Sequence, residues 1–380
     1  MAHLLVIRFS AIGDVAMTVP VLDSLARQYP ENQYTVVSQS FLSPLFARCP
    51  DNVGFMGIDL YNDYKGVPGM YRLYRELLKQ NFDAVADLHD VLRTKLLRIF
   101  FRCSGLKVKH IDKGRKEKRH LTRKENKIFR CLRPTTERYA DVFRALGQEL
   151  APLDFRSVFG ATCGDFSIIA PLTGAKTGIW AGIAPFAKHE GKIFPLDRME
   201  EVVKSLSERA DVTVFLFGGG AAEKAVFDAW CEKYPQTVSV AGKLDMVGEL
   251  VLMSYLDVML SMDSANMHLA SLTATPVVSV WGATHPYSGF YGYNQPIENA
   301  LQIDLPCRPC SVYGNKACYR KNTECMTNIT PKMVLDKMFI KLSSSRVYAD
   351  TPSAVYSLHR HSQTLPFRDS IAGDDPIRKQ

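Results

Sequence analysis

Short apolar runs alternate along this chain with longer segments whose apolar residues recur at helical spacing. In the first hundred residues, the runs 4–8, 34–38 and 84–88 read as strands, and 14–29 and 73–79 read as helices. This order is typical of βαβ units, whose strands lie parallel in one sheet that helices cover on both faces. The N-terminal part is therefore predicted to form a doubly wound α/β domain.

The same alternation starts again after a stretch around residues 155–174. Strands are predicted over 180–185, 212–217, 258–262 and 276–281, and helices over 197–208, 221–233 and 266–273. A chain of 380 residues exceeds what one core usually holds. We expect two Rossmann-like domains, 1–165 and 170–342, followed by a polar tail, 343–380, that packs weakly or is poorly ordered.

Composition excludes several classes of protein. Hydrophobic residues make up 46% and charged residues 23%, which is ordinary for a globular protein and argues against disorder or a coiled coil. No apolar stretch approaches the ~18 residues that a transmembrane helix needs. The first apolar run stops at Arg8 and reads as a strand and not as a signal peptide. Nine cysteines, an odd number, fit a reducing cytoplasm.

The net charge of +8 is concentrated in one segment. Residues 102–133 hold thirteen Lys and Arg against three acids, so this basic segment carries +10 and the rest of the chain −2. Such a segment attracts nucleic acid, an anionic membrane face or a phosphorylated substrate. The alternative is a solvated loop that only aids solubility.

Three strand ends lead directly into helix starts that suit a ligand, because ligands of open α/β sheets bind at the carboxyl ends of the strands. Gly13 and Asp14 follow the first strand, where a carboxylate facing a cleft could deprotonate a hydroxyl. Glycines 218–220 precede Glu223, which could accept hydrogen bonds from a ribose. Residues 263–268 combine a helix N-terminus with Ser264 and His268, a combination that suits a diphosphate. The alternative is a simple helix cap for Asp14 and for residues 263–264. It is a first-turn acid that complements the helix dipole for Glu223, and a packed polar residue for His268.

Two further stretches carry reactive groups. Lys188 and Lys192 lie in a loop after the first strand of the second domain and could neutralise phosphate, although a solvent-exposed loop is an equal alternative. Four cysteines, Cys307, Cys310, Cys318 and Cys325, could bind a structural metal, although their spacing is not that of two CxxC knuckles. Reduced packing cysteines are the alternative. The chain has no Asp-x-Asp, which counts against a sugar-nucleotide site built on a divalent metal.

Taken in order, several segments resemble the motifs of glycosyltransferase family 9, the lipopolysaccharide heptosyltransferase family. They are Arg8–Asp14, Asp87–Thr94, Lys192–Pro195, Asp263–Ala270, Thr275–Val278 and Trp281–Pro286. The resemblance spans about residues 3–340. Several positions depart from the family pattern: Asp90 and Ala265 replace glycines, and Phe194 replaces a tryptophan. Ala187 and Lys188 stand where the family often has a pair of hydroxyl residues at the phosphate.

The resemblance implies a GT-B fold, in which two Rossmann-like domains face each other across a cleft. It implies an inverting, metal-independent transfer of a heptose or related sugar from a nucleotide-sugar, with ADP-heptose as the expected donor and no cofactor. By position, Asp14 would be the general base on the acceptor hydroxyl. Donor binding is implied for Ser10, Gly13, Lys188, Lys192, Glu223, Leu244, Asp263, Ser264, Ala265 and His268.

The implied acceptor is an anionic, phosphorylated, lipid-linked saccharide of the lipopolysaccharide core. The basic segment fits such an acceptor at an anionic inner-membrane surface, where each charge is worth ~1 kcal/mol. We therefore expect a cytoplasmic protein that is peripheral to the inner membrane. Acceptor binding is expected for Arg8, Arg93, Arg115, Arg119 and Arg123.

Two other functions stay open at this point. The first is nucleic-acid binding on an inactive Rossmann scaffold. However, the basic segment offers only Phe129, His110 and His120 for base stacking, so no nucleic-acid partner is expected. The second is a glycosyltransferase that modifies protein instead of lipid, which only the choice of acceptor would distinguish.

Overall fold

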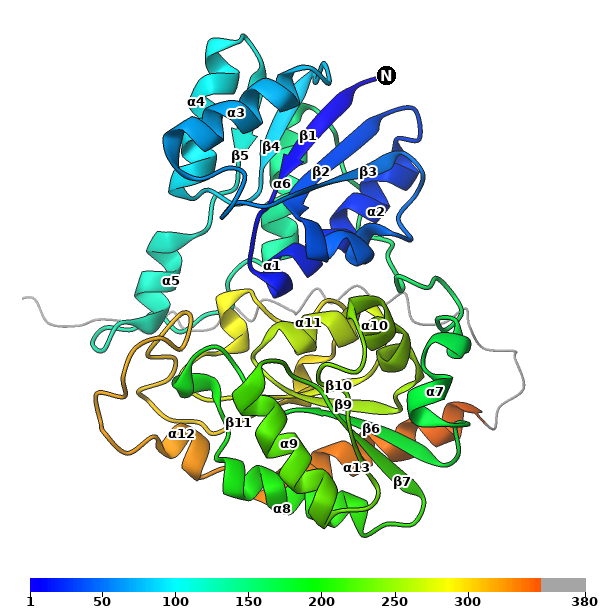
Figure 1. The fold of residues 1–380 in the computed structure, drawn as a ribbon. Coiled ribbons are helices and arrows are strands. Elements are labelled where there is room, and N and C mark those ends of the chain that lie inside the picture. The colour runs from blue at the N-terminus through cyan, green and yellow to red at the C-terminus, as the bar shows by residue number, and fades with distance from the viewer. Residues whose placement is uncertain (350–380) are drawn as a thin grey trace, which may run out of the picture.

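Each half of the chain forms a parallel β-sheet with helices on both faces (Figure 1). The structure is a computed structural model that describes residues 1–349, with the backbone alone for 343–349. The N-terminal sheet has the strand order β3-β2-β1-β4-β5 and the C-terminal sheet the order β11-β10-β9-β6-β7-β8. The two doubly wound domains predicted from the alternation are thus both present.

In the N-terminal domain, the first strand contributes side chains to the apolar cores on both faces of the sheet. Its strands are β1 (His3–Ile7), β2 (Gln33–Gln39), β3 (Val53–Ile58), β4 (Ala84–Asp87) and β5 (Lys107–His110). Its helices are α1 (Ile12–Ala16), α2 (Val19–Gln28), η1 (Ser40–Phe46), α3 (Gly66–Leu78), α4 (Leu92–Cys103), α5 (Arg115–Thr122) and α6 (Thr135–Leu146). Leu4 and Val6 pack with α2 and α6 on one face, and Leu5 and Ile7 pack with α3 and α4 on the other.

The C-terminal domain repeats this arrangement with one more strand. Its strands are β6 (Ile179–Ala184), β7 (Val212–Leu216), β8 (Thr237–Ser239), β9 (Val258–Met262), β10 (Val277–Trp281) and β11 (Ala300–Gln302). Its helices are η2 (Phe166–Ile168), α7 (Ala170–Thr173), η3 (Glu190–Lys192), α8 (Leu196–Ser207), α9 (Ala221–Lys233), α10 (Met246–Tyr255), α11 (Ala265–Leu272), η4 (Pro286–Ser288), η5 (Ile297–Asn299), α12 (Glu324–Thr327) and α13 (Pro331–Ala349).

Two predicted boundaries are wrong. The single helix expected over 14–29 is divided into α1 and α2, and Pro20 stands in the first turn of α2. Proline has no N–H to donate, and therefore suits a helix start better than a helix interior. The tail predicted from Ser343 begins too early, because α13 continues to Ala349. The remainder of that predicted tail, 350–380, lies outside the described residues.

The two domains are joined by direct packing of α1 on α11. One continuous apolar cluster includes Val15 and Met17 from the N-terminal domain and Met267 and Leu269 from the C-terminal domain. Figure 1 shows α1 lying directly above α11 where the two domains meet. The relative position of the domains is therefore fixed by buried apolar surface and not by the connecting chain alone.

A second connection comes from the basic segment, which crosses from one domain to the other. The backbone N–H groups of Leu132 and of Thr135, which follows the segment at the start of α6, donate to the carbonyls of Tyr287 and Gly289, at 2.9 and 2.8 Å. Lys127 Nζ donates to two more carbonyls of the C-terminal domain, at 2.9 Å each. Part of the charge that the sequence concentrates in this segment is therefore used to hold the domains together.

We predict that Gly13→Ala weakens the contact of α1 with α11. A Cβ at this position would lie 2.6 Å from the Cδ2 atom of His268, which real Cβ contacts do not reach. Overpacking of this kind costs about 1–3 kcal/mol, so the midpoint of thermal unfolding should fall. Calorimetry measures the midpoint. Gly219→Ala is the control, because an added Cβ there meets no atom within 4 Å; equal behaviour of the two variants would contradict the prediction.

Candidate active site

The site lies where the strand order of both sheets reverses. In the N-terminal sheet β1 has β2 on one side and β4 on the other, and in the C-terminal sheet β6 lies between β7 and β9. At such points the loops that follow neighbouring strands diverge to opposite faces, which leaves a crevice at the carboxyl ends of the strands. The contact of α1 with α11 turns the two crevices toward each other.

Asp14, the predicted base, is held by a buried arginine. The Arg8 guanidinium lies 2.7 Å from Asp14 Oδ2 and also donates to the Leu88 carbonyl at 2.7 Å. Arg8 is 5% exposed, whereas the Asp14 side chain keeps 28% of its surface accessible. Among the described residues no hydrogen bond reaches Asp14 Oδ1. Asp14 therefore presents one oriented oxygen that is free to accept a proton.

The larger cavity between the domains has a volume of about 640 Å³. It is lined by most of the residues predicted to bind the donor, together with the predicted base: Gly13, Asp14, Lys188, Lys192, Glu223, Asp263, Ser264, Ala265 and His268. These residues come from positions 13 to 268 of the chain and meet only because both switch points face the same space. The fold therefore brings most of the residues predicted to bind the donor into one cavity.

The N-terminus of α11 forms the positively polarised wall of this cavity. Ser264 is the N-cap, with no side-chain capping bond, so the first amides of the helix are available to an anion. Lys192 Nζ lies beside it and pairs with Asp263 Oδ2 at 2.9 Å. His268 is buried with its Nδ1 atom unpartnered, and burial lowers its pKa, so the ring is neutral. This wall suits a diphosphate.

The glycine-rich turn after β7 forms another part of the wall. Glu223 Oε2 accepts a hydrogen bond from the Gly219 N–H at 2.8 Å, which closes the turn and directs the carboxylate along the cavity. Sequence reasoning did not identify Glu249, which also lines this cavity. Burial raises the pKa of Glu249 to about 7, with a smaller contribution from the Asp245 charge.

A second cavity, of about 230 Å³, opens on the N-terminal side and is strongly basic. Lys118 is 5% exposed, forms no ion pair among the described residues, and holds its Nζ atom 3.9 Å from the centre of the Phe290 ring. Burial, and next the neighbouring Arg138, lower the pKa of Lys118 to about 8. Burying a charge without a partner is costly, so this lysine indicates that an anion enters the cavity from outside.

Two neighbours of Lys118 also point to an anionic ligand. Lys113 lines the same cavity, and burial lowers its pKa. His89 accepts a hydrogen bond from the Phe9 N–H on its Nδ1 atom, at 3.4 Å, so the proton of the neutral ring belongs on Nε2. Burial, followed by the charge of Arg8, lowers the pKa of His89 to about 3. The ring is therefore a neutral hydrogen-bond donor.

The two cavities share a wall, and the predicted base belongs to it. Ala11, Asp14, Phe290 and Tyr313 line both cavities. A molecule in the basic cavity and a molecule in the larger cavity would therefore meet at the Asp14 carboxylate. Ser10, predicted on the donor side, lines the basic cavity instead, together with Arg8.

Five other predicted binding residues lie outside both cavities. Leu244 packs at the edge of the core, and Arg93 lies over the Tyr61 ring at 5.5 Å. Arg115 pairs with Asp90 Oδ2 at 2.6 Å, and Asp90 occupies the family's glycine position with a positive φ of 45°. Arg119 is exposed on α5, and Arg123 donates to the Asn126 carbonyl. The assignment of acceptor binding to these arginines gains no support from the two cavities.

The residues that sequence reasoning missed had a weak signal. Lys118, Leu121 and Thr122 are the buried residues of α5 and recur at helical spacing, so one face of a highly charged helix is turned inward. A lysine among thirteen basic residues gives no sign in the sequence that it is the buried one. His89 differs in that it stands at a strand end, a position that could have been flagged.

The four late cysteines line a third cavity, of about 500 Å³, next to Lys188 and His189. All four are unbridged. In the described part of the chain, no three His, Cys, Asp or Glu side chains already stand close enough together to hold a metal ion.

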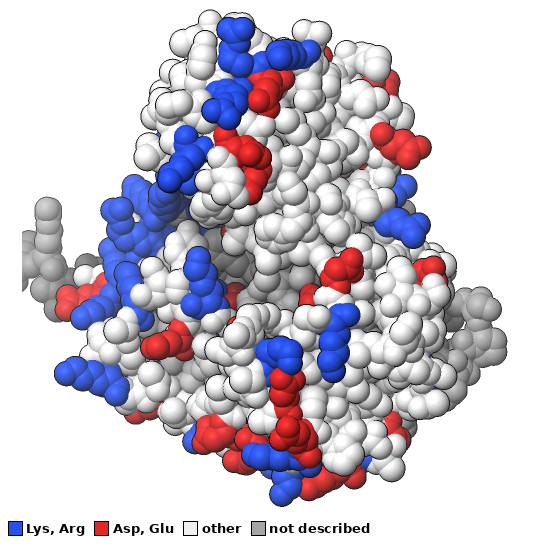
Figure 2. Space-filling model, viewed as in Figure 1, with Lys and Arg blue, Asp and Glu red and all other residues white. Residues whose placement is uncertain are grey.

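Charge on the surface is gathered along one edge. Figure 2 shows Lys and Arg concentrated beside α5 and up the N-terminal domain, with acidic and basic residues mixed over the C-terminal domain. Exposed members of the basic segment include Arg102, Lys109, Lys116 and Arg119. None of the helices described here combines the length and the apolar character needed to cross a bilayer.

Comparison with known proteins agrees with this geometry. A family model described as glycosyltransferase family 9 (heptosyltransferase) matches residues 70–320. The lipopolysaccharide core heptosyltransferase OpsX of Haemophilus influenzae is 25% identical, with 83% of this chain and 85% of that protein covered. Lipopolysaccharide heptosyltransferase 3 of Escherichia coli K12 is 26% identical over 72% of this chain and 80% of its own length.

Solved structures show the same fold. The family 9 glycosyltransferase of Veillonella parvula superposes with a TM-score of 0.69, at 17% identity, over 90% of this chain and 98% of that one. ADP-heptose lps heptosyltransferase II of E. coli gives 0.66, at 17% identity, over 90% and 99%. The GT-B fold predicted from the sequence is confirmed, and since the family model covers more than half of the sequence, the chain belongs to glycosyltransferase family 9, the heptosyltransferase family, and is a glycosyltransferase.

Proposed function

We propose that this enzyme transfers a heptose from ADP-heptose to an anionic saccharide of the lipopolysaccharide core, with inversion at the anomeric carbon. The observation that carries the proposal is the place of Asp14, at the junction of a donor-sized cavity and a basic cavity that holds a buried, unpaired lysine. The names of the relatives support the sugar and the acceptor class.

The donor occupies the larger cavity in this scheme. Its diphosphate lies against the N-terminus of α11 and the ammonium groups of Lys188 and Lys192, and Glu223 accepts hydrogen bonds from the ribose. Negative charge accumulates on the diphosphate as it leaves, so fixed cations and amides at that place stabilise the transition state. These groups supply the positive charge that the leaving group needs, so the scheme calls for no metal ion in the transfer step.

The acceptor hydroxyl reaches the anomeric carbon from the side of the basic cavity. Asp14 Oδ1 takes the hydroxyl proton while the acceptor oxygen forms its bond to the anomeric carbon. The bond from that carbon to the diphosphate oxygen breaks, and its electron pair leaves with ADP. Attack from the face opposite the leaving group inverts the configuration. Arg8 keeps the carboxylate oriented throughout.

An anionic group of the acceptor, a phosphate or a carboxylate, pairs with Lys118 and Lys113, and His89 Nε2 donates to a neighbouring oxygen. Acceptors of this kind are lipid-linked, and the exposed basic edge beside α5 would attract the anionic face of the inner membrane. We accordingly place the enzyme in the cytoplasm, peripheral to that membrane. The buried lysine favours this acceptor over an uncharged one.

We predict that Asp14→Asn lowers kcat by about 10²–10⁴-fold while donor affinity changes little, because the amide keeps the shape but cannot take the proton. Single-turnover assays give the rate, and thermal-shift titration with ADP-heptose, beside UDP-, GDP- and CMP-sugars, gives donor binding. Asp63→Asn, at an exposed position, is the matched control. A rate within tenfold of wild type would show that Asp14 is not the base. A thermal shift with another nucleotide-sugar alone would show that ADP-heptose is not the donor.

We predict that Lys118→Met raises the acceptor KM by about 10–100-fold, because a charge-assisted hydrogen bond worth about 1.5–3 kcal/mol is lost. In the wild-type enzyme the pKa of Lys118, about 8, lies below the ordinary lysine value of 10.5. The Lys118 ammonium is therefore present below pH 8 and is lost above it. The wild-type acceptor KM should therefore rise between pH 7 and pH 9, and that of the variant should not. Lys116→Met, exposed on the same helix, is the control. An unchanged KM in the variant would show that no anion binds there.

A further inference from the structure

The outer side of α4 is apolar, although its inner side already packs in the core. Leu97 and Phe101 are fully buried against the N-terminal sheet. Leu92, Leu96 and Ile99 recur at spacings of four and three residues and therefore share another side of the helix. Leu92 is 85% exposed and Ile99 is 56% exposed. A helix side that met only water would carry polar residues at these positions.

Helix α3 continues this apolar surface, and Figure 1 shows it beside α4 on the N-terminal domain. Val67 and Tyr71, four residues apart on α3, are 62% and 46% exposed. The Tyr71 ring meets the Phe100 ring of α4 edge-on, with 5.5 Å between the ring centres, and so joins the outer sides of the two helices. Tyr61, which is 67% exposed, lies under the guanidinium of Arg93 in α4, at 5.5 Å. We call this surface the apolar face; its members are Tyr61, Val67, Tyr71, Leu92, Ile99 and Phe100.

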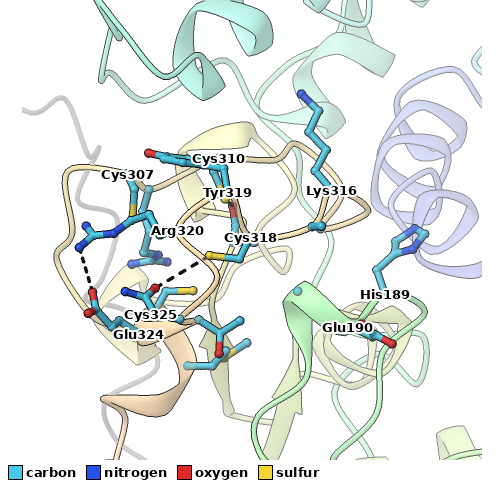
Figure 3. Close-up of a pocket in the computed structure, with 18 of the residues that line it drawn as sticks. His189, Glu190, Cys307, Cys310, Lys316, Cys318, Tyr319, Arg320, Glu324 and Cys325 are labelled. Atoms are coloured by element: carbon cyan, nitrogen blue, oxygen red, sulfur yellow. Dashed lines mark hydrogen bonds and ion pairs between the residues drawn. The ribbon is translucent and has the colours of Figure 1, made fainter.

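The cavities described above do not account for the apolar face. Its six residues line neither of the two cavities at Asp14 nor the cavity of the four late cysteines (Figure 3). A small ligand bound in one of these cavities would therefore leave the face exposed. Single apolar side chains are normal on a protein surface, whereas a contiguous group of them marks an interaction site.

Positive charge accompanies the apolar face. Helices α3 and α4 hold six Lys and Arg residues and a single acid, Glu76, so their side chains carry a net charge of +5. One of the six, Arg98, is buried and pairs with Asp87 and Asp90. The other five are exposed or half-buried: Arg72, Arg75, Arg93, Lys95 and Arg102. An apolar surface among basic side chains is complementary to an anionic bilayer, whose headgroups attract the cations and whose acyl chains accept the apolar groups.

The apolar face begins at the end of the N-terminal sheet that carries the candidate site. Leu92 is the first residue of α4 and follows His89, which lines the basic cavity, by three positions. Asp90, between them, pairs with Arg115 at the start of α5, at 2.6 Å. A surface that held the apolar face would therefore also lie close to the basic cavity.

We propose that the apolar face docks this enzyme on an anionic bilayer, with Tyr71, Leu92 and Ile99 entering the boundary between headgroups and acyl chains. Tyrosine suits this boundary, because its ring is apolar and its hydroxyl stays in contact with water. The basic side chains of α3 and α4 then meet the lipid phosphates. That docking brings the basic cavity to a lipid-linked acceptor rests on the proposed function, whereas binding to the bilayer does not.

A second copy of this chain fits the apolar face less well than a bilayer does. Two copies joined through this face would bring together two surfaces that each carry +5. Like charges placed opposite each other oppose association. An anionic bilayer supplies the opposite charge and buries the same apolar side chains.

The test is co-sedimentation of the full chain with vesicles, without donor or acceptor. One set of vesicles contains phosphatidylcholine alone, and the other contains about a third phosphatidylglycerol. We expect the wild-type chain to bind the anionic vesicles preferentially and to bind them more weakly as the salt rises from about 0.1 to 1 M. The double variant Leu92→Ser, Ile99→Ser should lower the partition coefficient by about tenfold or more, because two apolar side chains no longer enter the bilayer.

The matched control is Ile168→Ser, Ile297→Ser, at two residues of the C-terminal domain that are 42% and 46% exposed. It should bind the anionic vesicles as the wild type does. All four replaced side chains are exposed, and circular dichroism with thermal unfolding should show both variants folded as the wild type. The docking proposal is overturned if the wild-type chain binds anionic and neutral vesicles equally. It is also overturned if the Leu92→Ser, Ile99→Ser variant keeps the wild-type partition coefficient.

Two further measurements separate this proposal from its neighbours. Transfer to an acceptor embedded in anionic vesicles should fall in the Leu92→Ser, Ile99→Ser variant, while transfer to the same saccharide without its lipid should not change. Absence of any transfer by a wild-type chain that binds the vesicles would count against the proposed function and leave the docking face in place. Sedimentation velocity that shows a wild-type dimer and a monomeric Leu92→Ser, Ile99→Ser variant would assign the face to self-association and overturn docking.

Discussion

The packing of α1 on α11 sets the relative position of the two halves of the candidate site. The predicted base belongs to α1 and the diphosphate wall to the N-terminus of α11, so one helix contact fixes the separation of the two reacting partners. Gly13 permits the close approach to His268, and the apolar cluster through Val15 and Met267 stabilises it. In-line displacement tolerates little error in this separation. This explains why the domains share a buried core at the reaction centre.

Cations in this protein fall into two groups that serve different purposes. Arg8 is paired with Asp14, and Arg98 lies near both Asp87 and Asp90, so these arginines stabilise the N-terminal half of the site. Lys118 is equally buried but has no carboxylate partner among the described residues. A paired buried charge contributes to the architecture, whereas an unpaired one indicates a missing anion. The unpaired lysine marks the acceptor site that we propose.

Much of the fold was predictable because its signal is local. The strands 258–262 and the helix 221–233 appear with the predicted bounds, since uninterrupted apolar runs and helical spacing depend only on neighbouring residues. Edge strands were harder to predict from the sequence. For example, β3 contains two glycines and is only partly buried, so it lacks a strong apolar pattern. The break of the predicted helix 14–29 at residues 17–18 was missed, because Pro20 suggests a kink inside one helix, whereas it stands in the first turn of α2.

The sequence by itself determined the class of the fold, the family, and the residues at strand ends that meet in the larger cavity, because strand order and loop position follow from chain connectivity. Only the tertiary structure decided which of thirteen basic residues is buried. Lys118 lines the basic cavity and Lys127 crosses to the other domain, while Arg119 is exposed. Burial depends on contacts between segments far apart in the chain, and no pattern within the basic segment encodes them.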